Sequence, residues 1–172
     1  MTPSVIELRV TDEDRRLAAL AAAAVGLTLA EAAIPLPLPG IKPGLANIVT
    51  LIVLYRFGWR AAVWVSLLRI VAGGLVLGTF LTPTFVMSLA GGLASLLVLG
   101  FLVRLPGRWF GPVGLSVLAA FAHIGAQLGV VSVWLMPGVN LVPLLAVFLG
   151  AAWLSGLVNG LVVAKLRERK ND

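Results

Sequence analysis

Apolar runs of about twenty residues, almost free of charge, are the feature that most limits how this chain can fold. A helix needs about 20 apolar residues to cross the roughly 30 Å of hydrocarbon in a lipid bilayer. Of the 172 residues, 60% are hydrophobic and 12% are charged, whereas about a quarter of an ordinary soluble domain is charged. A chain this short cannot bury so much apolar surface inside a water-exposed shell. Lipid must therefore be the solvent for part of it.

The apolar runs predict six transmembrane helices and no strands, because the runs are long and do not alternate with polar residues. The expected helices cover residues 17–34, 45–57, 61–80, 85–103, 113–135 and 141–164. The predicted fold is therefore an all-α integral membrane protein, a bundle of six transmembrane helices. A cytoplasmic segment over residues 1–16 and a basic cytoplasmic tail over residues 166–172 would flank the membrane domain of residues 17–165.

Alternating prolines separate the first two expected helices, over residues 35–44. Proline removes backbone donors and favours extended conformations, so this stretch is predicted to be a loop. The second helix is too short to cross alone, and we expect the apolar loop to dip into the outer leaflet. Non-helical backbone at that depth needs cover from protein or a water-filled cavity. This indicates a pocket beneath the loop.

Basic residues are distributed unevenly between the two ends of the expected helices. With six crossings, the side that receives both termini holds eleven Lys and Arg residues, and the other side holds Lys42 alone. Cytoplasmic loops carry an excess of Lys and Arg, so both termini are predicted to be cytoplasmic. The net charge of +6 lies in short caps between apolar runs, which favours a lipid surface over nucleic acid as the partner. The chain contains no cysteine, and we expect no metal site and no cofactor.

Apart from Arg56 at the end of the second expected helix, two charged residues lie within the expected helices, and both are candidates for function. Glu31 is the only carboxylate there, and Arg69 is the only other Lys or Arg. A charge at that depth costs a few kcal/mol, so it normally faces a partner or a cavity. Arg69 shares a helix face with Ser66 and Gly73, small residues typical of close helix packing. Either the two charges form a structural ion pair, or Arg69 binds an anionic substrate and Glu31 lines the same cavity.

Other hydrogen-bonding side chains are expected in the outer half of the membrane domain. His123 and Gln127 lie four residues apart and therefore share a helix face, although such a histidine could equally bond a neighbouring carbonyl. The remaining candidates are Lys42, Asn47, Thr50 and Asn140. With Arg69, Lys42 and His123 facing Glu31 alone, a partly anionic ligand would supply the missing negative charge.

The first expected helix is rich in alanine in its cytoplasmic half. Pairs of small residues four apart let another helix approach closely. Four alanines form two overlapping pairs of this kind: Ala18, Ala19, Ala22 and Ala23. They indicate either a docking surface for a partner or packing inside the bundle.

Three sequence blocks resemble a bacterial membrane family. They are residues 34–51 (IPLPLPGIKPGLANIVTL), residues 66–69 (SLLR) followed by Gly73-Gly74, and residues 88–92 (SLAGG). The chain resembles the Gx transporters, also called heptaprenyl diphosphate synthase component I, over residues 17–165. This family is grouped with the substrate-binding S components of energy-coupling factor (ECF) transporters. Its pattern often lacks the proline found here at Pro43, a departure expected to stiffen the loop.

The resemblance implies a six-helix S component in the bacterial cytoplasmic membrane, with a pocket that opens outward beneath the loop between the first two helices. In such proteins an alanine-rich motif on the first helix docks on a transmembrane coupling subunit. Ala18, Ala19, Ala22 and Ala23 match that motif here. Two cytoplasmic ATPases complete the transporter. This chain has no G-x-x-x-x-G-K-[ST] loop for ATP.

The synthase name is not supported by the acidic residues. Prenyl diphosphate condensation uses clusters of aspartates that hold magnesium, and only Glu31 lies outside the polar tails. We therefore expect no enzyme activity from the chain itself. The leading hypothesis is a substrate-binding subunit of an ECF-type importer for a small, partly anionic nutrient or precursor. The alternatives are a non-catalytic accessory subunit of a heptaprenyl (polyprenyl) diphosphate synthase and a stand-alone channel or permease.

Overall fold

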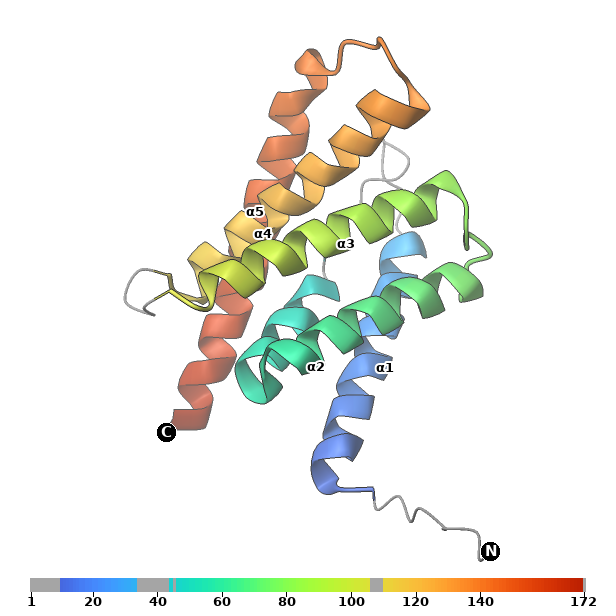
Figure 1. Cartoon of the computed structure of the whole chain (residues 1–172). Helices are drawn as coiled ribbons and strands as arrows, with labels where there is room; N and C mark the ends of the chain where they lie inside the picture. The colour runs from blue at the N-terminus through green and yellow to red at the C-terminus, as the bar shows by residue number, and fades with distance from the viewer. Residues whose placement is uncertain (1–9, 34–43, 45, 106–109, 172) are drawn as a thin grey trace, which may run out of the picture.

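The computed structural model describes residues 10–33, 44, 46–105 and 110–171, and over these residues the fold is all-α (Figure 1). The elements are α1 (Asp12–Ala33), α2 (Ala46–Val76), α3 (Pro83–Leu102), α4 (Pro112–Val130), the π-helical turn η1 (Val131–Leu135) and α5 (Val142–Asn171). All five α-helices are long and apolar enough to cross a membrane. The chain is therefore a membrane protein with several transmembrane helices.

The prediction of six separate helices is not confirmed, because the described chain forms five. The expected second and third helices, residues 45–57 and 61–80, are joined in α2. α2 is not one straight rod: Gly58 has non-helical angles, with φ 84° and ψ −177°, a region that only glycine occupies at low cost. In Figure 1 the chain changes direction sharply within α2, so that its two arms form a hairpin. We call these the first arm, before Gly58, and the second arm, after it.

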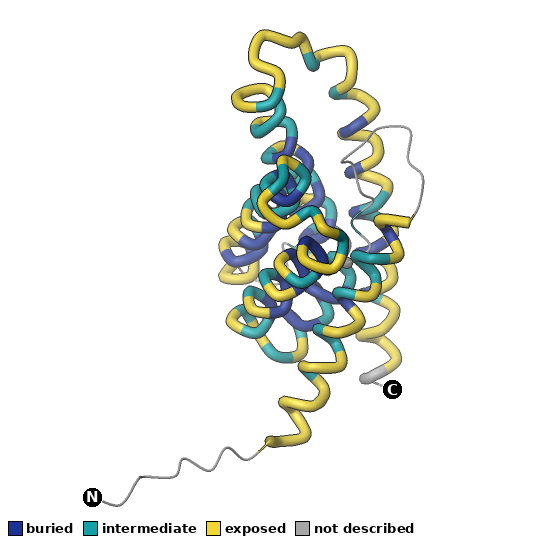
Figure 2. The backbone as a smooth tube through the Cα atoms, turned by 90° about the vertical axis from the view of Figure 1, so that its right-hand side faces the viewer, coloured by how far each residue is buried: buried dark blue, intermediate teal, exposed yellow. Residues whose placement is uncertain are grey.

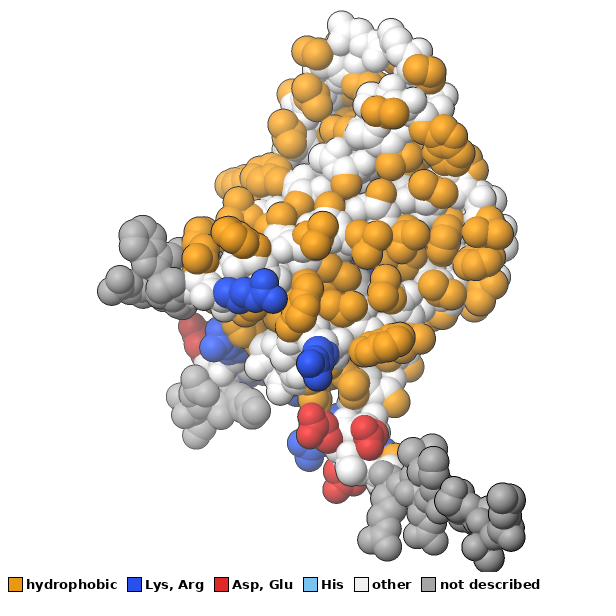
Figure 3. Space-filling model, viewed as in Figure 1, with side chains coloured by type: hydrophobic (Ala, Val, Ile, Leu, Met, Phe, Trp, Pro, Cys, Tyr) orange, Lys and Arg blue, Asp and Glu red, His pale blue; other side chains and the backbone are white. Residues whose placement is uncertain are grey.

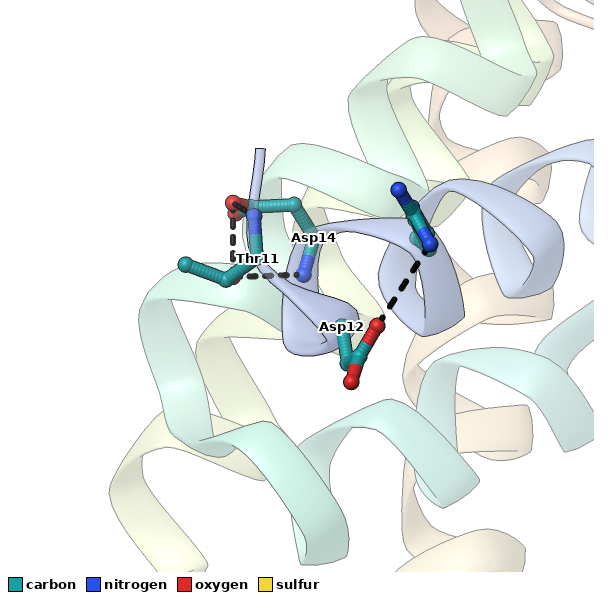
Figure 4. Close-up of polar contacts among 4 residues, drawn as sticks. Thr11, Asp12 and Asp14 are labelled. Carbon is teal, nitrogen blue, oxygen red and sulfur yellow. Dashed lines mark hydrogen bonds and ion pairs between the residues drawn. The ribbon is translucent and has the colours of Figure 1, made fainter. Parts of the chain in front are cut away.

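Two helix boundaries also differ from the sequence-based expectation. α1 begins at Asp12 because Thr11 and Asp14 cap it reciprocally. The Thr11 backbone N–H donates to Asp14 Oδ2 (2.9 Å), and the Asp14 N–H donates to Thr11 Oγ1 (3.2 Å) (Figure 4). α5 continues to Asn171 instead of stopping before residue 166. Lysine and arginine are good helix formers, and they interact favourably with the C-terminal end of the helix dipole.

The second arm of α2 ends earlier than expected, at Val76. Gly78, with φ 66°, takes the left-handed conformation that closes a helix. Its N–H donates to the carbonyl of Leu75, and the N–H of Thr79 donates to the carbonyl of Gly74 (2.8 Å). This bonding pattern is a Schellman motif. α3 then begins with a proline in its first turn, where no backbone donor is needed.

Helices that follow one another in the chain pack side by side. α1 packs chiefly against α2, α3 against α4, and α4 against α5. The backbones of α4 and α5 come very close at two glycines of α5. A Cβ added at Gly156 would lie 2.7 Å from Val117 Cα, and one added at Gly160 would lie 2.5 Å from Val113 Cα. Buried Leu, Val and Ala side chains of all five helices form the main core. Ser95 Oγ donates to the buried carbonyl of Ala119 (2.8 Å), which ties α3 to α4.

Exposed positions occur along the outside of every helix (Figure 2), and hydrophobic side chains cover much of the face drawn in Figure 3. Leu97 is 72% exposed and Val133 is 81% exposed, which suits contact with lipid rather than water. Lys and Arg side chains on the face drawn in Figure 3 gather toward the end where α1 begins and α5 ends. At this end Arg167 lies over the ring of Tyr55, 4.2 Å from its centroid. The start of α1, the kink of α2 and the end of α5 thus share one basic end of the molecule.

The kink provides a test of the hairpin in α2. We expect Gly58→Ala to lower the melting temperature, because alanine at this φ costs about 1–3 kcal/mol. The matched control is Gly125→Ala on α4, where an added Cβ has no atom within 4 Å and the change to alanine favours the helix. Thermal unfolding of both purified variants measures the effect. Equal melting temperatures would contradict a strained turn at Gly58.

Candidate functional site

A polar cavity of about 40 Å³ lies among four helices, at the end of the bundle opposite the basic end. Its walls come from the end of α1, both arms of α2, the start of α3 and the second half of α4. Six hydrogen-bonding residues contribute most to its chemistry: Glu31, Asn47, Arg69, Ser88, His123 and Gln127. The cavity therefore collects polar groups from segments far apart in the sequence into an otherwise apolar bundle.

Arg69 holds the centre of this arrangement from the second arm of α2. Its side chain is buried, with 6% exposed, and Nη2 donates to Asn47 Oδ1 in the first turn of the same helix (2.8 Å). Nε finds no acceptor among the described residues. One helical turn after Arg69, the missing side chain of Gly73 leaves room for Thr28 of α1. A Cβ added at Gly73 would lie only 2.9 Å from Thr28 Cγ2. The guanidinium is thus fixed in direction and keeps one donor available.

Glu31 lies on the inner face of α1 and lines the same cavity as Arg69. It is 3% exposed. Thr28, three residues earlier and on the same face, also lines the cavity, and its hydroxyl donates to the carbonyl of Ala24 (2.9 Å). A buried cation and a buried carboxylate thus share one cavity, which lowers the cost of burying either charge alone.

His123 and Gln127 lie on adjacent turns of α4 and contact each other. Gln127 Nε2 is 3.1 Å from His123 Nε2, so the amide donates to the imidazole in its Nδ1-protonated tautomer. Within the described chain, His123 Nδ1 and Gln127 Oε1 then have no hydrogen-bond partner. With Arg69 Nε, these atoms give the cavity two free donors and one free acceptor. Such groups are costly to bury unpaired, and a polar ligand would satisfy them.

The structure brings together five of the eight residues predicted to bind substrate: Glu31, Asn47, Arg69, His123 and Gln127. Thr50 is buried one turn after Asn47 but is not among the cavity's lining residues. Asn140 is exposed and instead accepts from the N–H of Val142 (3.1 Å) at the start of α5. Asn140 was predicted to bind substrate because it directly precedes the last expected helix, and the structure shows that it caps this helix instead. Lys42 and the proline-rich loop lie outside the described residues.

Several polar residues at or near the cavity were missed by sequence reasoning, among them Thr28, Thr79, Ser88 and Asn159. Thr28 and Ser88 line it, and their signals were present: Thr28 precedes Glu31 by one helical turn, and Ser88 begins the third block of the family pattern. Asn159 of α5 is 2% exposed, and its Nδ2 donates to the carbonyl of Gly44, just before α2 (2.9 Å). This bond spans 115 residues of sequence, and no local pattern could have indicated it.

The chemistry of the cavity is that of recognition by hydrogen bonds and charge. A guanidinium, an imidazole and two amides face one carboxylate. In the part of the chain that the structure describes, no three His, Cys, Asp or Glu side chains lie close enough to hold a metal ion together. The arrangement favours a small anionic or hydrogen-bonding group of a ligand, held in place by Arg69.

The comparison with known families agrees with the sequence-based resemblance. A model of the family described as heptaprenyl diphosphate synthase component I matches residues 20–166. No curated protein and no solved structure matches the chain. Since the matched stretch covers most of the 172 residues and every described residue of the polar cavity, the chain belongs to the heptaprenyl diphosphate synthase component I family.

Proposed function

We propose that this chain is the substrate-binding membrane subunit of an ECF-type, ATP-driven importer. Its ligand is a small molecule with a partly anionic group, which the polar cavity binds. A transmembrane coupling subunit and two cytoplasmic ATPases act with it. The observation that carries the proposal is the convergence of buried polar groups from α1, α2, α3 and α4 on one cavity around Arg69.

The outer surface of α1 supports the docking part of the proposal. Ala18, Ala19, Ala22 and Ala23 are all exposed, so they do not serve packing within the described bundle. The inward face of the same helix uses Leu17, Leu20 and Ala24 instead. Exposed surfaces elsewhere carry large apolar side chains such as Leu97. A face made of small residues alone suits close approach of another helix better than contact with lipid.

The orientation follows from the basic end of the molecule. We propose that each arm of α2 crosses the membrane, which gives six crossings and leaves both termini on one side. Excess Lys and Arg mark the cytoplasmic side in such proteins. Arg15, Arg60, Arg104 and Arg167 belong to the basic end or to loops on its side of the bundle. The polar cavity then faces outward in a bacterial cytoplasmic membrane, as an importer requires.

A second candidate function comes from the family's name. The chain could serve as a non-catalytic membrane accessory subunit of a heptaprenyl diphosphate synthase. The two functions differ in their partners. Mild detergent extraction followed by affinity purification from the native host should recover a coupling subunit and two ATPases for the importer. Recovery of a polyprenyl synthase in their place would favour the accessory role.

The proposed topology is testable because the chain has no cysteine of its own. We expect Pro83→Cys, at the first residue of α3, to react with a membrane-impermeant thiol reagent in intact cells. Arg104→Cys, after the other end of α3, should react only once the membrane is opened. Both positions are exposed, so accessibility from one side decides the result. The reverse labelling pattern would place the cavity on the cytoplasmic side and overturn the orientation.

The role of Arg69 is testable through a co-purified ligand. We expect Arg69→Gln to weaken binding by about 2 kcal/mol or more, because it removes a buried charged donor. Arg69→Lys should also weaken binding, since lysine cannot make the paired bonds of a guanidinium. Native mass spectrometry measures the fraction of protein that carries the ligand, and thermal unfolding is measured on the same samples. Arg60→Gln, at an exposed basic residue outside the cavity, is the control and should change neither.

Glu31→Gln separates the two readings of the buried charges. If Glu31 and Arg69 form only a structural ion pair, Glu31→Gln and Arg69→Gln both lower the melting temperature and leave ligand occupancy unchanged. If Arg69 binds the ligand, occupancy falls in stably folded Arg69→Gln protein. Unchanged occupancy in that variant would remove Arg69 from the binding site.

Docking on α1 is tested by Ala22→Leu. We expect this variant to fold and to keep its ligand, because Ala22 is exposed in the isolated chain. Leucine at a close helix crossing should reduce recovery of the co-expressed coupling subunit by about tenfold or more. The matched control is Ala151→Leu on α5, which is also exposed and should keep full recovery. Normal assembly of the Ala22→Leu protein would mean that this surface is not the docking site.

A further inference from the structure

A second cavity, with an apolar lining, adjoins the polar one. It measures about 250 Å³ and lies between the start of α3, the end of α4 with η1, and the start of α5. α4 and α5 diverge toward the turn that connects them (Figures 1 and 2), in contrast to their close contact at Gly156 and Gly160. We call this second cavity the apolar groove.

Gln127 belongs to both cavities, and among the described residues that line the apolar groove it is the only polar one. The other contributors include Met87 of α3, Leu128 of α4 and Phe148 of α5. Methionine adapts its shape to irregular partners. Val131 and Leu135 of the π-helical turn also line the groove, and π-turns within helices frequently occur at functional sites.

The polar cavity alone is too small for a complete nutrient. Its volume of about 40 Å³ is room for a few water molecules, since one water needs about 10–15 Å³ of such space. Sites for small organic ligands usually measure about 300–1,000 Å³. The polar cavity therefore suits one small polar group, and the rest of the molecule needs another space. The apolar groove is the adjoining space that is large enough.

We propose that the two cavities form one amphipathic binding site, whose ligand combines a small anionic head with a hydrocarbon body. The head, a carboxylate or a phosphate, accepts hydrogen bonds from Arg69 Nε and His123 Nδ1. The hydrocarbon body lies in the apolar groove against Met87, Leu128 and Phe148. This inference rests on the proposed binding role of Arg69 and adds the chemical class of the substrate.

The position of Gln127 argues against a groove that merely faces membrane lipid. Its side chain is 4% exposed, and its Nε2 lies 3.1 Å from His123 Nε2. A surface that only contacts lipid tails gains nothing from a buried pair of polar side chains, because burying polar groups costs free energy. At the junction of the two cavities, the same amide orients His123 so that its Nδ1 donates to the anionic head.

The probes are dodecanoate, dodecyl phosphate and dodecanol, each with a diazirine at the far end of the chain for photo-crosslinking. The purified full-length protein in lipid nanodiscs is irradiated with each probe, and cross-linked peptides are mapped by mass spectrometry. We expect at least one anionic probe to label the peptides that line the groove about tenfold more than dodecanol does. Arg69→Gln should remove that excess, because the charged head loses its main partner.

Filling the groove tests the hydrocarbon part separately. Leu144→Trp and Met136→Trp both place a large side chain in the groove and should each reduce anionic labelling by about tenfold. Val147→Trp is the matched control on α5: it is 58% exposed, does not line the groove, and should leave labelling unchanged. Melting temperatures show which of the two filled variants are folded. Met136 is 55% exposed, so tryptophan at this position disturbs the packing least.

The outcomes separate this inference from the proposed function. Equal labelling by anionic probes and dodecanol, insensitive to Arg69→Gln, would overturn the amphipathic site and leave the groove as a lipid contact. The amphipathic site would also be overturned if occupancy by the co-purified ligand falls in Arg69→Gln but is unchanged in both Leu144→Trp and Met136→Trp. The proposed function as a substrate-binding subunit would then stand. A co-purified ligand whose occupancy does not depend on Arg69 would instead overturn the proposed binding role of Arg69, on which this inference rests.

Discussion

The hydrogen bond from Arg69 Nη2 to Asn47 Oδ1 joins the two arms of α2 at the end opposite their kink. A guanidinium buried in a bilayer-sized bundle costs several kcal/mol unless its donors are satisfied, so this contact restricts how the arms can lie. Gly58 supplies the turn, and Arg69 supplies the bond that holds the arms together. The bond uses only part of the guanidinium. Nε has no acceptor among the described residues, and Arg69 lines a cavity shared with α1, α3 and α4.

A second contact fixes the same region from the other side of the chain. Asn159 of α5 donates to the carbonyl of Gly44 (2.9 Å), so the segment that enters α2 is tied to the last helix. The start of α2 therefore carries two long-range hydrogen bonds, to Arg69 and to Asn159. Elsewhere the bundle is held mainly by apolar packing and by close backbone approach, as at Gly156, with one buried hydrogen bond from Ser95 to the carbonyl of Ala119. Polar contacts concentrate at the end of the molecule where binding is proposed.

Much of the fold and part of the site could be predicted from local sequence. Apolar runs of the right length indicated the membrane helices, and buried ionisable residues such as Glu31 and Arg69 indicated an inner polar region. The prediction of six separate helices is not confirmed, because hydropathy reports length and not the direction of the backbone at Gly58. Asn140 was chosen for its place beside a helix start, yet it caps Val142. Periodicity cannot tell a capping asparagine from one that faces a cavity.

The amino-acid sequence by itself determined that lipid surrounds this chain, that its family is that of heptaprenyl diphosphate synthase component I, and that Glu31 and Arg69 are its buried charges. These properties depend on composition and on local spacing, which a sequence states directly. Only the tertiary structure decided that His123 and Gln127 meet Arg69 at one cavity, that Asn159 holds Gly44, and that an apolar groove begins at Gln127. Such contacts join helices distant in the chain, and the relative rotation and divergence of those helices result from packing over their whole length.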